Sequence, residues 1–147
     1  MDKEITKYTW DQFDKDIANL VRRIDYAKFK PKTIIGVAKG GLPAGVKLAN
    51  ILGVPLMVIS AASYQGQEQG ALAFNTSFVR PLESPVLIID EIVDSGKTMS
   101  AIANYISSLG IVVKTAALFY KERSIFRPDW FMSKASDDQW IQYPWEG

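Results

Sequence analysis

The spacing of apolar residues along the chain separates helices from strands. Over residues 10–24 the apolar positions are three and four apart, which predicts an amphipathic helix, and Thr9 with Gln12 forms a capping-box pattern at its start. Three shorter runs are almost continuously apolar and rich in β-branched residues, as is typical of strands buried on both faces. These runs are 33–38, 56–60 and 86–90.

Two strand–turn–helix units follow from this pattern. The first run leads through the glycine pair 40–41 into helical spacing over 43–53. The third run leads through a polar turn, 91–97, into a helix over 98–109, and a further apolar strand is expected over 111–120. Strands alternating with helices predict an α/β fold: an open, mostly parallel twisted sheet with flanking helices.

Composition limits the organisation and the chemistry of the chain. It has 147 residues, of which 48% are hydrophobic, and neither His nor Cys. This length and apolar content predict a single domain over 1–147 that needs no disulfide. Imidazole and thiolate catalysis are excluded, so acid–base chemistry must use Asp, Glu, Lys or Tyr.

Charge and hydropathy limit the partners. The 17 basic and 16 acidic residues leave a net charge of +1, so no strong field attracts a polyanion, and we expect no nucleic acid partner. No apolar run reaches the roughly 18 residues of a membrane helix, and the charged N-terminus is unlike a signal peptide. We therefore expect no stable membrane insertion and a cytoplasmic location.

The segment 61–79, between the two units, has a polar first half that contains two glycines and several glutamines. It predicts either a mobile lid or an edge hairpin, because so few apolar anchors are available to order it. We call this segment the hood.

The turn after the third apolar run has the chemistry of a sugar phosphate site. Its residues open a helix, so backbone N–H groups and hydroxyls converge on an anion at the positive end of the helix dipole. Asp90 and Glu91 suit ribose hydroxyls or a magnesium ion, and Asp94 is a third carboxylate. A Walker A loop would need glycine where Glu91 stands, which disfavours a nucleoside triphosphatase. The phosphate cradle is Ser95, Gly96, Lys97 and Thr98.

The stretch Val86–Thr98 resembles the phosphoribosyl pyrophosphate motif of the type I phosphoribosyltransferase family. Other segments follow in the order expected of the 6-oxopurine branch, including its short xanthine-guanine members. They are 37–41, similar to the pyrophosphate loop; Ser63 and Tyr64, similar to the start of the flexible hood; 119–121 and 138–141, similar to the base-binding elements; and 10–11 and 142–146, similar to the short members.

The resemblance implies roles at the phosphoribosyl end of the site. Asp90 and Glu91 would bind the ribose hydroxyls and Mg²⁺, and Lys39 with Gly40 would meet the pyrophosphate. Relatives often have a cis peptide bond just before that lysine, which here is the bond between Ala38 and Lys39. They also place a basic residue in the hood, whereas this chain has none between Tyr64 and Phe78.

The resemblance also implies how the base is bound, in a C-terminal segment over 121–147. Asp94 would accept the purine N7 proton as general base, and Lys121 would donate to the 6-oxo group. Trp140 would stack on the purine, and the backbone around Ile141 would read position 2. The bland interpretations are a helix N-cap for Asp94, a surface lysine for Lys121 and ordinary core for Trp140. Trp10, Trp130 and Trp145 are assigned to core or interface.

A purine salvage transferase is the function that these residues favour. It would move 5-phosphoribosyl from 5-phosphoribosyl 1-pyrophosphate to guanine, hypoxanthine or xanthine, with Mg²⁺ as cofactor, in a homodimer or homotetramer. The alternatives are a nucleotide-sensing or RNA-binding regulator on the same fold, and a transferase acting on adenine or a pyrimidine.

Overall fold

The computed structural model describes residues 4–63, 72–76 and 81–147, with side chains described over 4–61 and 81–147. In chain order, the described elements are β1 (Glu4–Lys7), α1 (Trp10–Tyr26), β2 (Thr33–Ala38), α2 (Leu42–Leu52), β3 (Leu56–Ser63), β4 (Leu72–Thr76), β5 (Val86–Val93), α3 (Lys97–Ser108), β6 (Val113–Lys121), β7 (Trp130–Ala135), β8 (Gln139–Gln142) and a 3₁₀ helix, η1 (Pro144–Glu146).

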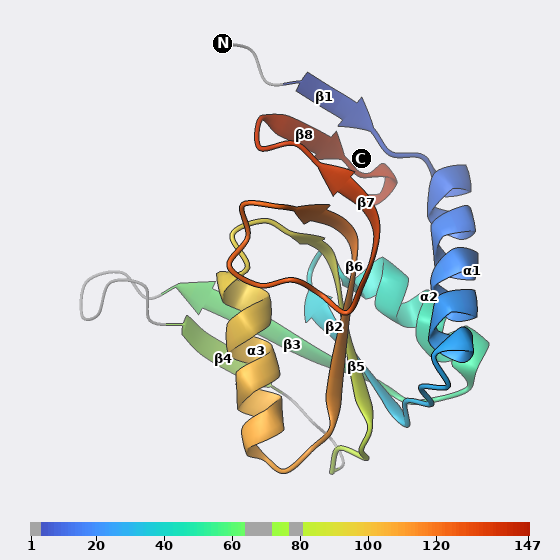
Figure 1. The fold of residues 1–147 in the computed structure, drawn as a ribbon, viewed down its shortest axis with the longest axis vertical. Helices are drawn as coiled ribbons and strands as arrows, with labels where there is room; N and C mark the ends of the chain where they lie inside the picture. Colours follow the sequence, from blue (N-terminus) through green and yellow to red (C-terminus); the bar gives the residue numbers. More distant parts are fainter. Residues whose placement is uncertain (1–3, 64–71, 77–80) are drawn as a thin grey trace.

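A six-stranded sheet in the order β4-β3-β2-β5-β6-β7 organises the molecule (Figure 1). Its strands are parallel except for β4, which runs antiparallel to β3 at one edge. The prediction of an open, mostly parallel α/β sheet is therefore confirmed. Among the described residues, no helix combines the length and apolarity needed to span a bilayer.

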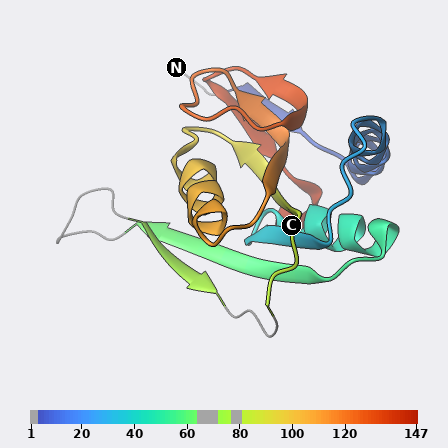
Figure 2. The same cartoon turned by 60° about the horizontal axis from the view of Figure 1, so that its bottom comes forward.

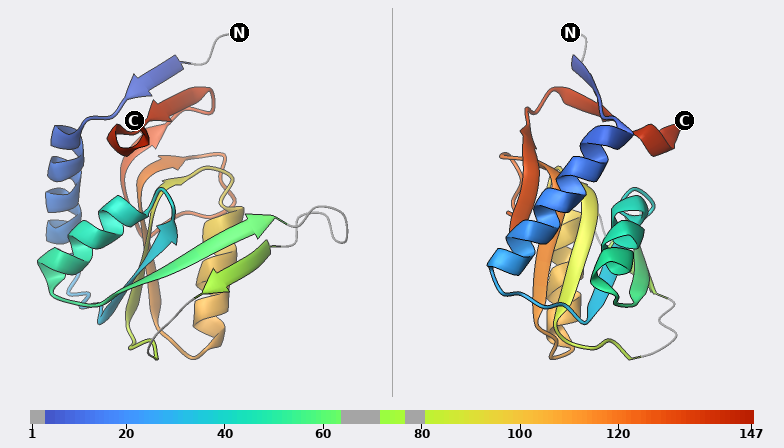
Figure 3. Two further views of the ribbon diagram at one scale, coloured as in Figure 1. Left: turned by 180° about the vertical axis from the view of Figure 1, so that it is seen from behind. Right: turned by 90° about the vertical axis from the view of Figure 1, so that its right-hand side faces the viewer.

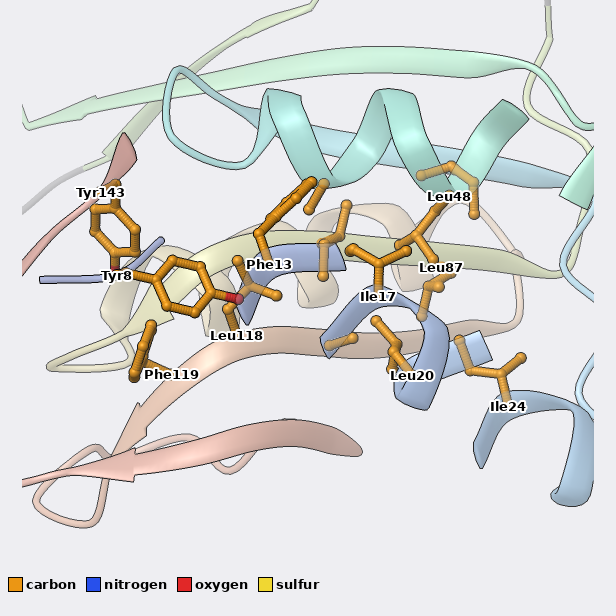
Figure 4. Packing of buried hydrophobic residues seen from close by; sticks show 14 of the residues in the cluster. Tyr8, Phe13, Ile17, Leu20, Ile24, Leu48, Leu87, Leu118, Phe119 and Tyr143 are labelled. Atoms are coloured by element: carbon orange, nitrogen blue, oxygen red, sulfur yellow. The ribbon is translucent and has the colours of Figure 1, made fainter. Parts of the chain in front are cut away.

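Helices cover both faces of the sheet, so its central strands are buried on both sides. On one face, Ile34 and Leu87 pack with α1 and α2, whose buried side chains include Ile17 and Leu48 (Figure 4). On the other face, the intervening residues, such as Ile35 and Ile88, pack against α3. This double burial explains the continuous apolar runs in the sequence.

Two of the predicted helix ends, the start of α1 and the end of α2, are confirmed. The Thr9 side chain accepts a hydrogen bond from the Gln12 N–H, and the Gln12 side chain accepts one from the Thr9 N–H, which completes the capping box. At the end of α2, Gly53 has φ +67°, the left-handed conformation that glycine adopts without steric cost.

The predicted end of β5 was wrong by three residues. The sequence placed a polar turn from Glu91, but β5 continues to Val93, because Ile92 pairs with Phe119 and Val93 with Tyr120 of β6. Backbone pairing with a long neighbour thus outweighs the local polarity. Asp90 and Glu91 lie inside the strand, and the turn itself is confined to 94–96.

The hood is described in part. β3 ends at Ser63, which pairs with Leu72 of β4, so these two strands form an edge hairpin that projects from the body of the sheet (Figure 2). Tyr64, the glutamines of the hood and Arg80, the first basic residue after the hood, lie outside the described residues, and the prediction of a mobile lid remains a prediction.

A second, two-stranded sheet joins the two ends of the chain. β1 pairs in parallel with β8, and the segment after β8 turns back toward the start of α1 (Figure 3). The sequence analysis did not predict β1, β7 or β8.

Candidate active site

The site lies where the strand order reverses direction. From β2 the chain crosses through α2 to β3 on one side, whereas from β5 it crosses through α3 to β6 on the other. Such a switch point opens a crevice at the carboxyl ends of the two central strands. Two adjoining cavities, of about 780 and 270 Å³, are found there, and the residues that line both are Lys39, Gly40, Glu91, Ile92 and Asp94.

The smaller cavity has the features of a phosphate site. Ser95, Gly96 and Thr98 line it at the start of α3, and the first turn of that helix holds no acidic residue. Backbone N–H groups at a helix start attract anions. Lys97, predicted as part of the cradle, is exposed and lines neither cavity.

Gly96 allows this turn to pack tightly. It has φ +86°, and a Cβ atom there would lie 2.2 Å from Ser124 Oγ and 2.7 Å from the Phe126 nitrogen. The turn after β6 also binds the cradle directly, because the Ile125 N–H donates to the Ser95 carbonyl at 2.9 Å. The cradle therefore rests on the segment that follows Lys121.

The pyrophosphate-loop candidates pack against the carboxylate pair. The Ala38–Lys39 peptide bond is cis, as the resemblance implied. A Cβ atom on Gly40 would lie 1.0 Å from Glu91 Oε2, so a side chain at this position would displace that carboxylate. Lys39, Gly40 and Glu91 are thus brought together at the boundary between the cavities.

Asp90 and Glu91 are held in an environment that disfavours two negative charges. Burial and the neighbouring Glu91 raise the pKa of Asp90, and burial also raises the pKa of Glu91. Asp90 Oδ1 accepts a hydrogen bond from the Glu91 N–H at 2.8 Å.

This carboxylate pair fits Mg²⁺ only together with a ligand. The described residues contain no cluster of three or more metal-ligating side chains. Mg²⁺ commonly binds one or two carboxylates and completes its shell with water and substrate phosphates. The pair therefore suits a magnesium ion that arrives with a pyrophosphate better than a resident ion in a cage of protein ligands.

Asp94 faces two cations. Its Oδ1 accepts hydrogen bonds from Arg123, one of them from Nε at 3.1 Å, and lies 3.6 Å from Lys121 Nζ. Burial alone would raise the pKa of Asp94, but the Arg123 hydrogen bonds and the two positive charges hold it below its ordinary value. Asp94 is therefore an ionised acceptor at neutral pH.

Lys121 lies at the end of β6 and is only 6% exposed, so it is no ordinary surface lysine. Its Nζ donates to the Asp137 carbonyl at 3.3 Å, and both residues line the larger cavity.

The larger cavity is lined on its other side by the C-terminal segment. Trp140 is 53% exposed at its rim, and Ile141 is buried. Tyr143 and Trp145, whose rings stack at 5.0 Å, also line it. The arrangement offers flat apolar surfaces beside the polar pair Asp94 and Lys121, as a planar base with polar edges requires.

Most of the predicted site residues therefore converge, with three exceptions. Lys97 is exposed and lines neither cavity, the Ser63 side chain is not described, and Tyr64 lies outside the described residues. As individual site residues, sequence analysis missed Arg123, Asp137, Tyr143 and Glu146. It assigned Trp145 to core or interface, although Trp145 also lines the larger cavity. For Arg123 a signal existed: it follows Lys121 by two residues, at the same strand-ending edge.

A phosphate cradle, two strand-borne carboxylates and an adjoining aromatic cavity define a site for a phosphorylated sugar next to a planar base. Comparison with known proteins agrees, since residues 8–146 match the phosphoribosyl transferase domain. The chain belongs to this family.

The relatives and solved structures that the chain resembles include purine phosphoribosyltransferases. The chain is 30% identical to a xanthine-guanine phosphoribosyltransferase of Nitratidesulfovibrio vulgaris, over 98% of this chain and 86% of that protein. A purine phosphoribosyltransferase of Pyrococcus horikoshii has a similar structure, with a TM-score of 0.84, 32% identity, and coverage of 98% and 95% of the two chains. The structure of a xanthine-guanine-hypoxanthine phosphoribosyltransferase of Helicobacter pylori is also similar, with a TM-score of 0.86 and 26% identity. The match covers 97% of this chain and 94% of that chain.

Proposed function

We propose that this protein is a purine salvage phosphoribosyltransferase. It transfers 5-phosphoribosyl from 5-phosphoribosyl 1-pyrophosphate to N9 of guanine, hypoxanthine or xanthine, and releases pyrophosphate. The observation that carries the proposal is the position of Asp94: it lines both cavities and lies directly before the cradle, facing Lys121. One carboxylate thus lies between a phosphate site and a base site.

The residues divide the work by cavity. The start of α3, with Ser95, Gly96 and Thr98, binds the 5′-phosphate, and the carboxylates of Asp90 and Glu91 accept hydrogen bonds from the ribose hydroxyls. Lys39 and the backbone of Gly40 face the pyrophosphate. Fixing both reactants in line lowers the entropic cost of the transfer.

Mg²⁺ would be held by Asp90 and Glu91 together with the donor's pyrophosphate, and would neutralise the negative charge of the leaving group. Positive charge grows on the ribose as the bond to pyrophosphate breaks, and nearby carboxylates stabilise it.

The base is selected at Asp94 and Lys121. Ionised Asp94 accepts the N7 proton as N9 becomes bonded to the ribose. The Lys121 ammonium donates to a 6-oxo group and meets a donor instead when the base is adenine, which disfavours adenine. Trp140 and Tyr143 provide the apolar walls of the base site.

Turnover with each base in turn tests the function. Pyrophosphate release and nucleotide formation are measured with guanine, hypoxanthine, xanthine, adenine and uracil, with and without Mg²⁺. We expect turnover with 6-oxopurines only, dependent on Mg²⁺, and a loss of about 10² or more in turnover for Asp94→Asn with nucleotide binding retained. Nucleotide binding by the wild-type protein without turnover would contradict the proposal and favour the regulator.

The proposal extends to assembly and location. Family resemblance supports a cytoplasmic homodimer or homotetramer, and exposed apolar side chains on α2, Val46 and Ile51, offer surface for an interface. Sedimentation velocity at micromolar concentration distinguishes these assemblies, and a monomer would contradict this part of the proposal.

A further inference from the structure

Arg123 is a charged residue of the site to which the proposed reaction assigns no role. It lies in the turn after β6, lines the larger cavity and has a half-exposed side chain. Its partner is Asp94, the same carboxylate that the proposed function uses as general base.

The turn that carries Arg123 is fixed at both ends. The Ser124 N–H donates to the Lys121 carbonyl at 2.9 Å, and the Ile125 N–H donates to the Ser95 carbonyl at the same distance. Ser124 Oγ also donates to the Phe126 carbonyl at 2.7 Å. The backbone that presents Arg123 is therefore tied to both the base site and the phosphate cradle.

The cations converge on one oxygen of Asp94. Arg123 donates from Nε and Nη2 to Oδ1, and Lys121 Nζ lies 3.6 Å from the same atom. Within the described part of the chain, the side-chain hydrogen bonds of Asp94 are accepted by Oδ1, and its ion pairs with Lys121 and Arg123 are also made at that atom. A carboxylate held by one oxygen keeps the lone pairs of the other for a ligand.

We propose that Arg123 is a positioning residue for Asp94: its fork of donors fixes Oδ1 and leaves Oδ2 to accept the N–H of the incoming purine. The inference rests on the proposed function, because it assigns the carboxylate to the purine. An arginine suits this task better than a lysine, since its planar guanidinium sets direction as well as charge.

The charges around Asp94 agree with this role. Lys121 and Arg123 face it from β6 and the following turn, and Tyr143 lies near it from the C-terminal segment. On the far side of Arg123, Asp137 Oδ1 lies 3.9 Å from Nε and competes for the guanidinium. The two cations favour the ionised form of Asp94, so loss of Arg123 raises its pKa.

Three variants test the proposal. R123Q removes both the positive charge and the paired N–H donors of the guanidinium, whereas R123K keeps only the positive charge. R127Q is the matched control: Arg127 is in the same connection between β6 and β7 and lies over the Phe131 ring at 5.4 Å, away from Asp94. For each variant, kcat and the KM for both substrates are measured from pH 5 to 9. The Asp94 carboxyl is titrated by ¹³C NMR in the free protein.

For R123Q we expect kcat to fall about tenfold or more, because the carboxylate loses its orientation, with the KM for 5-phosphoribosyl 1-pyrophosphate within about twofold of wild type. The acid limb of the pH profile and the Asp94 titration both move to higher pH. R123K retains the wild-type acid limb but not the wild-type kcat, and R127Q matches wild type throughout.

Three results overturn the proposal. Full recovery of kcat in R123K shows that charge alone suffices, and a higher kcat in R123Q shows that Arg123 blocks Asp94. An unchanged Asp94 titration in R123Q also contradicts the proposed role of Arg123. If the wild-type protein still turns over 6-oxopurines, the proposed function is unaffected by that result. If wild-type protein has no turnover, the proposed function fails on its own, and the titration still tests the contact.

Discussion

Lys121 is a buried cation whose position depends on two oxygens, the Asp137 carbonyl at 3.3 Å and Asp94 Oδ1 at 3.6 Å. A lysine is rarely buried unless it is paired, because its ammonium loses hydration. Lys121 also lines the larger cavity, where the proposed 6-oxo group would accept a further hydrogen bond from its ammonium.

Lys121→Met keeps the length of the side chain and removes the donor. We expect kcat/KM for hypoxanthine to fall about ten- to hundredfold, since a hydrogen bond to a charged group contributes about 1.5–3 kcal/mol. Discrimination against adenine should narrow at the same time. Steady-state kinetics with both bases measures each effect.

The control for this change is Lys114→Met, on the same strand. Lys114 is half-exposed and pairs with Asp129 at 3.8 Å, far along β6 from the site. Lys114→Met removes the same charge and should leave kcat/KM for hypoxanthine and for adenine unchanged. Wild-type use of hypoxanthine by Lys121→Met would mean that the base binds elsewhere.

At the scale of elements, the start of α3 depends on one glycine. Gly96→Ala would place a Cβ atom 2.2 Å from Ser124 Oγ and 2.7 Å from the Phe126 nitrogen, in a left-handed backbone conformation. The conformation costs about 1–2 kcal/mol for a residue with a Cβ, and the contact with backbone adds to it. We expect a loss of more than about 2 kcal/mol in the free energy of unfolding and weaker binding of ribose 5-phosphate.

The variant Gly53→Ala separates the cost of the left-handed backbone conformation from the cost of the close Cβ contact. Gly53 also has positive φ, at the end of α2, but nothing lies within 4 Å of a Cβ there. Only the conformational cost should appear, with ribose 5-phosphate binding intact. Urea denaturation and calorimetric titration measure both quantities, and equal losses in the two variants would show that Ser124 and Phe126 yield freely.

The central elements were predictable because their signals are local. The capping box at Thr9 and the glycine at the end of α2 are short-range patterns, and double burial makes strands such as β2 uniformly apolar. The start of α3 was predictable for the same reason, since its signal lies in one continuous segment.

The missed features depend on contacts between distant segments. β5 extends past Asp90 because β6 pairs with it as far as Tyr120. β1 and β8 lie at opposite ends of the chain, so neither has a neighbour in the sequence that reveals its pairing. Arg123 acquires its meaning only when the fold places it against Asp94.

At the scale of the whole molecule, the two ends of the chain build one wall of the site. β1 pairs with β8, and Trp145 packs against residues from the start of the chain, with ring distances of 5.5 Å to Phe13 and 5.9 Å to Trp10. Because Trp145 also lines the larger cavity, packing at the N-terminus supports the wall of that cavity, which is the proposed base site.

Trp145→Ala should therefore affect stability and base binding together. We expect a loss of about 2–3 kcal/mol in the free energy of unfolding, below the range for a fully buried tryptophan because this side chain is partly exposed. Guanosine monophosphate should bind at least about tenfold more weakly, while ribose 5-phosphate, held in the smaller cavity, keeps its affinity.

Trp130→Ala supplies the comparison that separates general destabilisation from loss of the cavity wall. Trp130 is also partly buried and packs on Phe29 at 5.8 Å, but it does not line the larger cavity. A similar loss of stability with wild-type nucleotide affinity is expected. If both variants weaken the binding of guanosine monophosphate equally, the effect of Trp145→Ala on binding comes from lost stability alone. That result would contradict the inference that the chain ends support the proposed base site.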